Sequence, residues 1–193
     1  MLRPKNNKTK PRIKHRPFLK WAGGKFRLTD DLNRVFPKRK QCLIEPFVGA
    51  GAVFLNSHFE RYILADINPD LINLFNIVKE NVDIYIEACK PIFFAENANT
   101  ADYYYAQRDA FNQSSEPFER SVLFLYLNRF GFNGLCRYNS KNEFNVPFGA
   151  YKTHYFPEDE LRYFAHKAQS AVFLCADFQQ TFELADKHSV IYC

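Results

Sequence analysis

The sequence has 193 residues, of which 47% are hydrophobic, and its formal net charge is +5 at pH 7. A chain of this length and composition can bury a substantial core and is expected to fold as one domain. It has no run of about 18 apolar residues that could cross a membrane, and its first residues lack the apolar segment of a secretory signal. We therefore expect a cytoplasmic protein without a membrane partner.

The cysteines agree with this expectation. There are five of them, which is an odd number, and they are widely separated in the sequence. No C-x-x-C motif or Cys/His ligand spacing is present. We expect reduced thiols and no metal site.

The positive charge is concentrated at the N-terminus. Residues 1–17 hold seven of the 26 Lys and Arg side chains and no acid, which leaves 19 basic against 21 acidic residues in the remainder. We expect residues 1–16 to form a disordered, solvated tail. Its charge would otherwise add non-specific attraction to a polyanion.

The first motif, FLKWAGGK at residues 18–25, precedes a helical pattern. It is not a phosphate-binding P-loop, because no glycine lies five residues before Gly24 and Phe26 stands where Ser or Thr would hold Mg²⁺. One interpretation is a tight turn with Trp21 in the core. The other is a ligand site, in which Trp21 forms an aromatic wall and Lys25 binds the carboxylate of a zwitterionic ligand.

A strand, a turn and a helix are predicted around the sequence EPFVGAG at residues 45–51. The strand is expected at 42–46, and residues 52–55 are the apolar start of the helix. Gly49 and Gly51 allow a tight turn and leave room for a ligand close to the backbone. Turns of this kind occur in many α/β folds, so the motif by itself indicates only a nucleotide-binding turn.

The second predicted strand, residues 61–68, contains Asp66 near its end. Asp66 follows Gly49 by 17 residues, close to the spacing of about 20 at which an acid accepts hydrogen bonds from a ribose. A carboxylate suits a ribose with free 2′ and 3′ hydroxyls, as in S-adenosylmethionine (AdoMet) or NAD. Alternatively, Asp66 caps the next helix, but Asn68 followed by Pro69 can serve as that cap.

Residues 69–128 are predicted to be a long helical insertion, with segments at 82–94, 101–112 and 117–128 and a cap at Thr100. Its aromatic side chains are expected to pack between helices. They are Tyr103, Tyr104, Tyr105, Phe111, Phe118, Phe124 and Tyr126.

Residues 128–149 mix aromatic, basic, Asn and Gly residues. Residues 135–138 and 144–148 are expected to pair as a hairpin closed by residues 139–142. One interpretation is an ordinary hairpin with a solvated face. The other is a DNA-reading element, because arginine matches guanine, asparagine matches adenine, and apolar side chains can wedge between bases.

The last part of the sequence returns to an α/β pattern. An amphipathic helix is predicted at 157–169, with acidic residues in its first turn. A third strand at 171–175, a short helix at 179–185 and a fourth strand at 189–193 follow.

Five segments together resemble the Dam-type DNA adenine methyltransferases, which are α-class amino-methyltransferases. The resemblance runs from about Pro17 to Cys193. It implies an α/β fold with a Rossmann-like AdoMet methyltransferase core, an incomplete sheet, and a helical and β-hairpin DNA-recognition insertion. It also implies methyl transfer from AdoMet to adenine N6 in duplex GATC, by a monomeric, metal-free bacterial enzyme. The segments are, in order, residues 18–25, 45–51, 65–68, 128–149 and 177–178.

The resemblance assigns cofactor-binding residues by motif. Trp21 and Lys25 would contact the amino-acid moiety of AdoMet, and Glu45, Phe47 and Gly49 would line its pocket. Asp66 would bind the ribose. Asp177 and Phe178 would flank the adenine ring.

The resemblance likewise assigns DNA-binding residues. Arg137 would read guanine and Phe132 would be the stacking wedge, although close family members often have Tyr there. Ala150 stands where a basic residue is common, which removes one expected phosphate contact. The other assigned residues contact neighbouring bases or lie near DNA: Asn133, Leu135, Pro147, Lys20 and Lys152.

No catalytic residue is assigned. In the family, the fourth strand runs into Asp-Pro-Pro-Tyr, and this sequence stops at Cys193, one residue before that motif would begin. Adenine N6 is a poor nucleophile, so a polar acceptor and a stacking ring must hold the flipped base. We therefore expect little or no methyl transfer by residues 1–193 alone, and an aggregation-prone edge at 189–193.

The expected organisation is a basic tail at 1–16, a first part of the core at 17–80, a DNA-recognition region at 81–156 and a continuation of the core at 157–193. Two alternatives remain open. One is a non-catalytic DNA-binding module that uses the hairpin and the tail. The other is an NAD-dependent oxidoreductase, although the turn lacks the third glycine of its fingerprint.

Overall fold

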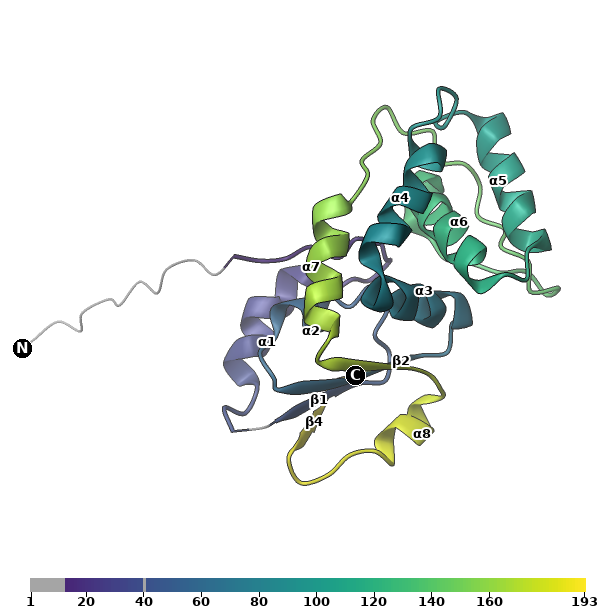
Figure 1. The fold of residues 1–193 in the computed structure, drawn as a ribbon. Coiled ribbons are helices and arrows are strands. Elements are labelled where there is room, and N and C mark those ends of the chain that lie inside the picture. Colours follow the sequence, from purple (N-terminus) through teal and green to yellow (C-terminus); the bar gives the residue numbers. More distant parts are fainter. Residues whose placement is uncertain (1–12, 40) are drawn as a thin grey trace, which may run out of the picture.

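The computed structural model of the chain describes residues 13–39 and 41–193. Its centre is a parallel sheet with the strand order β3-β2-β1-β4 (Figure 1). The fold is therefore α/β, as predicted. The strands are β1 (Cys42–Glu45), β2 (Arg61–Asp66), β3 (Ala171–Cys175) and β4 (Ser189–Ile191).

Helices cover both faces of the sheet. The helices α2, α3 and α7 lie on one side and α8 on the other, while α5 and α6 stand farther from the strands (Figure 1). The predicted helical insertion is thus present between β2 and β3. The helices are α1 (Thr29–Val35), α2 (Ala52–Asn56), α3 (Pro69–Glu80), α4 (Val82–Phe93), α5 (Ala101–Gln113), α6 (Pro117–Phe130), α7 (Glu158–Ala168) and α8 (Phe178–Phe182), with 3₁₀ turns η1 (Phe26–Leu28) and η2 (Phe132–Gly134).

The burial of the residues in each strand matches the place of that strand in the sheet. All four residues of β1 are buried, because it lies between β2 and β4. In β3, exposed and buried residues alternate at first, as expected for an edge strand. The fourth strand is also an edge of this sheet, and its Ile191 is 40% exposed. The predicted edge is confirmed, although β4 is shorter than the expected 189–193.

Local capping chemistry positions the helices around the sheet. The Asn68 side chain accepts hydrogen bonds from the backbone of Asp70 and Leu71, and Thr100 accepts one from Tyr103. Both caps were predicted. Each satisfies helix N–H groups that have no partner within the helix.

Aromatic packing joins the helices of the insertion. Tyr104, Phe111, Phe124 and Tyr126 are fully buried, and Tyr103 packs against the same core. The prediction that these rings pack between helices is confirmed for them. Two other members of the predicted set are more open, with Tyr105 37% and Phe118 39% exposed.

The region between α6 and Tyr151, which we call the recognition segment (residues 131–149), only partly forms the expected hairpin. It has isolated antiparallel bridges, Tyr138 with Phe144 and Gly131 with Phe148, and no extended ladder. Side chains from α5 take the place of a strand. Asn112 hydrogen-bonds both the N–H and the carbonyl of Phe144.

The N-terminal residues that the structure describes are not free of the core. Lys14 forms an ion pair with Asp30, at 2.7 Å between Nζ and Oδ2. The ring of His15 stacks on Tyr163 with 3.4 Å between centroids. The expected disordered tail therefore does not extend to residues 14 and 15, and its first twelve residues lie outside the described range.

Two further observations concern the whole described chain. Across residues 13–39 and 41–193, no helix is both long and apolar enough to cross a membrane. All five cysteines are free thiols, with Cys42 and Cys89 buried.

Candidate functional site

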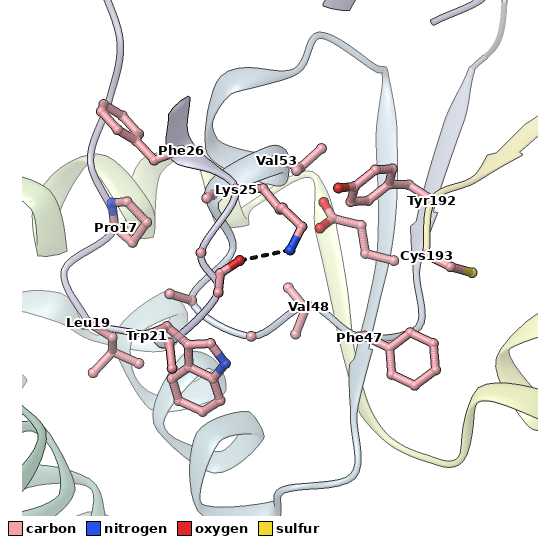
Figure 2. Close-up of a pocket in the computed structure, with 17 residues that line it drawn as sticks. Pro17, Leu19, Trp21, Lys25, Phe26, Phe47, Val48, Val53, Tyr192 and Cys193 are labelled. Atoms are coloured by element: carbon pink, nitrogen blue, oxygen red, sulfur yellow. Dashed lines mark hydrogen bonds between the residues drawn. The ribbon is translucent and has the colours of Figure 1, made fainter. Parts of the chain in front are cut away.

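A cavity of about 420 Å³ lies at the carboxyl ends of β1 and β4. One wall is formed by the loop at 18–25 and the other by residues 45–53 (Figure 2). The end of β4 closes it with Tyr192 and Cys193. Ligands of open parallel sheets bind at this end of the strands, so this is the expected place for a nucleotide-like ligand.

Gly49 brings the two walls together. Its φ of +50° is in the left-handed region, and a Cβ at this position would lie 2.9 Å from Nε1 of Trp21. The position thus needs glycine for both its conformation and its space. Trp21 is half-buried and lines the cavity, so the aromatic-wall interpretation describes it better than a core residue.

Glu45 places a carboxyl group at the base of the cavity. Its side chain is 2% exposed, and Oε1 is buried without a hydrogen-bond partner among the described residues. Burial raises the pKa of Glu45 to about 8, and the Phe54 amide and the charge of Lys167 only partly oppose this. A buried acceptor of this kind suits a ligand that brings a positive charge or an N–H donor.

Lys25 supplies the opposite charge at the mouth of the cavity. It is exposed, and among the described residues its ammonium donates to the carbonyl of Gly23 alone, at 2.8 Å (Figure 2). Such a side chain can turn toward a ligand's carboxylate at small cost. Glu45 and Lys25 together match a zwitterion with a cationic and an anionic group, and AdoMet is a ligand of that kind.

Asp66 contacts the glycine turn without lining the cavity. Its Oδ2 accepts from the N–H of Gly49 at 3.2 Å, and its Oδ1 accepts from Asn68 at 3.1 Å. The carboxylate is therefore held next to the turn from which a ribose would be reached. Since Asn68 caps α3, Asp66 is not required for that cap.

Of the two residues predicted to flank the adenine, Phe178 lies beside Phe47. The ring of Phe178 packs on Phe47 with 5.8 Å between centroids, and Asp177 caps α8. Phe47 itself lines the cavity and is 60% exposed. The structure thus places five of the eight predicted residues in the cavity wall and two, Asp66 and Phe178, in contact with it, whereas Asp177 adjoins Phe178 in the sequence and does not line the cavity.

The predicted DNA-binding residues lie around the recognition segment. Phe132 is 48% exposed, and Asn133, Arg137, Pro147 and Lys152 are also exposed. Two predicted residues are less open: Leu135 is half-buried, and so is Lys20.

Arg137 is exposed but oriented. Its guanidinium donates to the side-chain oxygen of Asn145 at 2.7 Å and to the backbone oxygen of the same residue at 3.0 Å. These two bonds hold the Arg137 guanidinium against the second half of the recognition segment.

The side chain of Lys20 makes contacts that were not predicted. Its Nζ donates to the Arg129 carbonyl at 2.8 Å and lies 3.7 Å from the centre of the Tyr151 ring. Burial, with the nearby charge of Arg129, lowers the pKa of Lys20 to about 8.

Sequence reasoning missed two polar residues behind the site. Lys167 of α7 donates to the Ser57 carbonyl at 2.7 Å, and burial lowers its pKa to about 8. Asn128 is 1% exposed and bonds to the 18–25 loop. Lys167 and Asn128 each follow apolar residues on a buried helix face. A polar residue that continues such a face was the feature of the sequence from which both could have been found.

These features define a nucleotide-binding α/β domain of the AdoMet methyltransferase type. They are the parallel sheet, the glycine turn after β1, the acid at the end of β2 and the cavity suited to a zwitterion. The comparison with known families agrees. A profile of the D12 class N6 adenine-specific DNA methyltransferases matches residues 21–193. The chain belongs to this family.

Individual relatives point the same way. The chain is 84% identical over 193 residues to the DNA adenine methylase of Haemophilus influenzae, an alignment that covers all of this chain and 68% of that protein. It is 59% identical over 180 residues to the DNA adenine methylase of Escherichia coli (strain K12), covering 93% and 64%. It is 58% identical over 180 residues to that of Vibrio cholerae, with the same coverage. The chain thus spans about two thirds of the length of these relatives.

Proposed function

We propose that this chain contains the cofactor-binding and DNA-recognition parts of an enzyme that methylates adenine N6 in duplex GATC, with AdoMet as methyl donor. The observation that carries the proposal is the buried oxygen of Glu45, which has no hydrogen-bond partner in the described part of the chain, in a cavity that Trp21 and Lys25 also line. A methyltransferase family requires a donor, and AdoMet is the general one. The named DNA adenine methylases support the substrate.

Each residue of the cavity has a proposed task. Glu45 accepts a hydrogen bond from the cationic end of the donor, and Lys25 neutralises its carboxylate. Asp66, held by Gly49, takes the ribose hydroxyls. AdoMet supplies an electrophilic methyl group on a sulfonium, and these groups orient it and exclude water.

The DNA side is proposed to read the duplex through the recognition segment. Because the target base must leave the stack to be methylated, the enzyme needs an apolar side chain to fill the gap. Phe132 is exposed enough for that task. Arg137 presents guanidinium donors of the kind that pair with O6 and N7 of guanine. We propose that residues 17–80 and 157–193 form the core and 81–156 the DNA-recognition region.

Intrinsic fluorescence tests the cofactor site directly, since Trp21 is the only tryptophan of the sequence. Titration with AdoMet is expected to change the emission of this residue, and titration with NAD is not. Lys25→Met should weaken AdoMet binding about tenfold through the lost charge pair. A response to NAD equal to that for AdoMet would contradict the methyltransferase assignment in favour of an oxidoreductase.

Methyl transfer to short duplexes tests the DNA site, using a chain extended past Cys193. Arg137→Ala is expected to lose about 1–3 kcal/mol of discrimination between GATC and a guanine-substituted site. Lys141→Ala, an exposed change on the same segment, serves as the control and should keep the discrimination. Equal rates of the unmodified enzyme on both duplexes would rule out GATC reading.

A further inference from the structure

Two asparagine side chains hold the chain at the two ends of residues 15–20. The His15 N–H donates to Oδ1 of Asn56 and the Asn56 amide donates to the His15 carbonyl, both at 2.9 Å. Asn128 pairs with Lys20 in the same manner, with both distances 2.8 Å. Each amide offers one acceptor and one donor to a single residue's backbone, as a neighbouring strand would.

The two pairs differ in what else the amide binds. Asn56 also donates to Ala52, within its own helix. Asn128 also donates to the carbonyl of Gly134, at 3.3 Å. The Asn128 amide therefore joins the 18–25 loop to the recognition segment, whereas Asn56 joins its end of the chain only to α2.

The loop and the recognition segment touch directly at this point. Gly134 has a φ of +59°, and a Cβ there would lie 2.1 Å from Cβ of Lys20. The Lys20 ammonium extends the contact to the Arg129 carbonyl. A displacement of Gly134 cannot be absorbed here by empty space, so it has to move the backbone of Lys20.

The cavity begins one residue later. Trp21 follows Lys20 directly, and its indole lies against Gly49. On the other side, Phe132 and Asn133 belong to the same 3₁₀ turn as Gly134. A short path of packed backbone thus runs from exposed residues of the recognition segment to the wall of the cavity.

We propose that Asn128 is a positioning residue that couples ligand binding in the cavity to DNA binding at the recognition segment. The inference rests on the function proposed above. DNA that seats Phe132 and Asn133 fixes Gly134, and through Asn128 it fixes the backbone that carries Trp21. By thermodynamic linkage, AdoMet in the cavity strengthens GATC binding by the same factor.

The test measures that factor in the chain extended past Cys193, with S-adenosylhomocysteine as a ligand that cannot be turned over. Its dissociation constant is determined by calorimetry with and without a short GATC duplex. The unmodified protein is expected to bind the nucleoside at least about fivefold more tightly with DNA. Asn128→Ser should bring the ratio close to one, and Asn56→Ser, the matched control, should keep it.

The outcomes separate the two proposals. A protein that binds neither S-adenosylhomocysteine nor GATC refutes the proposed function itself. If both ligands bind, a ratio of one in the unmodified protein, an unchanged ratio in Asn128→Ser, or an equal loss in Asn56→Ser overturns the role of Asn128. A merely structural role would lower thermal stability in both variants without separating their ratios.

A measurement on the unmodified protein covers the case in which Asn128→Ser does not fold. The Lys20 N–H is bonded to Asn128, so its hydrogen exchange reports on this contact. Addition of the GATC duplex alone is expected to slow that exchange, whereas the His15 N–H on Asn56 should be unaffected. Unchanged exchange at Lys20 would also overturn the proposal.

Discussion

The glycine turn after β1 and the recognition segment are shaped by different forces. The turn leads from β1 into α2 and lies beside a continuous parallel ladder, in which Glu45 at the end of β1 pairs with Leu64 of β2 and the Val48 N–H donates to the Ala65 carbonyl. The recognition segment has only isolated bridges, and side chains of α3, α5 and α6 satisfy many of its polar groups. The turn is therefore fixed mainly by backbone geometry, and the recognition segment mainly by a few side chains, each of which can be removed separately.

The largest expected effect, when the losses of stability and of ligand binding are added, is on the turn. Gly49→Ala places a methyl group within 2.9 Å of the Trp21 indole at a φ of +50°. We expect a loss of about 1–2 kcal/mol in unfolding free energy from the left-handed conformation. Displacement of the aromatic wall should also weaken AdoMet binding by about 1.5–3 kcal/mol. Denaturant unfolding and tryptophan fluorescence measure the two parts.

Gly51→Ala is the matched control for that change. Gly51 has a φ of +74°, but a Cβ there meets nothing closer than 3.5 Å. It should lose similar stability and keep AdoMet affinity. Equal affinity losses in the two variants would show that conformation, and not the contact with Trp21, shapes the wall.

The second effect concerns the anchor of the recognition segment on α3. Asp70 accepts two hydrogen bonds from Arg120, at 2.9 and 3.0 Å, and one from the Tyr138 hydroxyl at 2.6 Å. Asp70→Ala leaves the largely buried Arg120 charge without its carboxylate, although Arg120 still donates to the Phe111 and Ser114 carbonyls. We expect a loss of about 3 kcal/mol in unfolding free energy. Asp83→Ala, which breaks the exposed pair with Arg162, should cost less than about 1 kcal/mol.

The same contrast explains what the sequence could reveal. The strands, the Asn68 and Thr100 caps and the glycine turn were predictable, because periodicity and capping are local signals. Glu45 and the glycine turn could be placed at the ligand-binding edge because they follow a parallel strand, whereas Trp21 and Lys25 were placed with them by the family resemblance alone. The pairing of Asn128 with Lys20 spans 108 residues, and nothing local in the sequence indicates such a contact.

The hairpin expected from residues 135–138 and 144–148 is less regular than predicted, for a related reason. Residues 144–148 look like a strand, yet Asn112 takes the polar groups of Phe144, and the Tyr104 hydroxyl donates to the Val146 carbonyl at 3.0 Å. These bonds replace a ladder. Alternating apolar residues predict an extended conformation, but they do not say what the backbone will bind.

The third effect follows from that replacement. Asn112→Ala removes both partners of the Phe144 backbone, which should cost about 2 kcal/mol and speed hydrogen exchange at the Phe144 N–H. Asn73→Ala, which removes one exposed bond to Pro117, should change neither by a measurable amount. If exchange at Phe144 stays slow in Asn112→Ala, the segment is held by its own bridges, and the contrast with the glycine turn is weaker than described.

The last expected effect returns to the cavity and concerns pH. Because the pKa of Glu45 is raised to about 8 in the folded protein, the neutral acid prevails at pH 6. Ionisation of this buried group costs stability, so its favourable contribution is complete below its unfolded pKa and is lost as pH rises toward 8. A cationic ligand binds the ionised form, and AdoMet affinity should therefore rise between pH 6 and 8, by at most about tenfold per pH unit.

Glu45→Gln should remove this slope and be more stable than the unmodified chain at pH 8. Lys167 also has a pKa of about 8, and a slope that persists in Glu45→Gln would assign the pH dependence to that lysine instead.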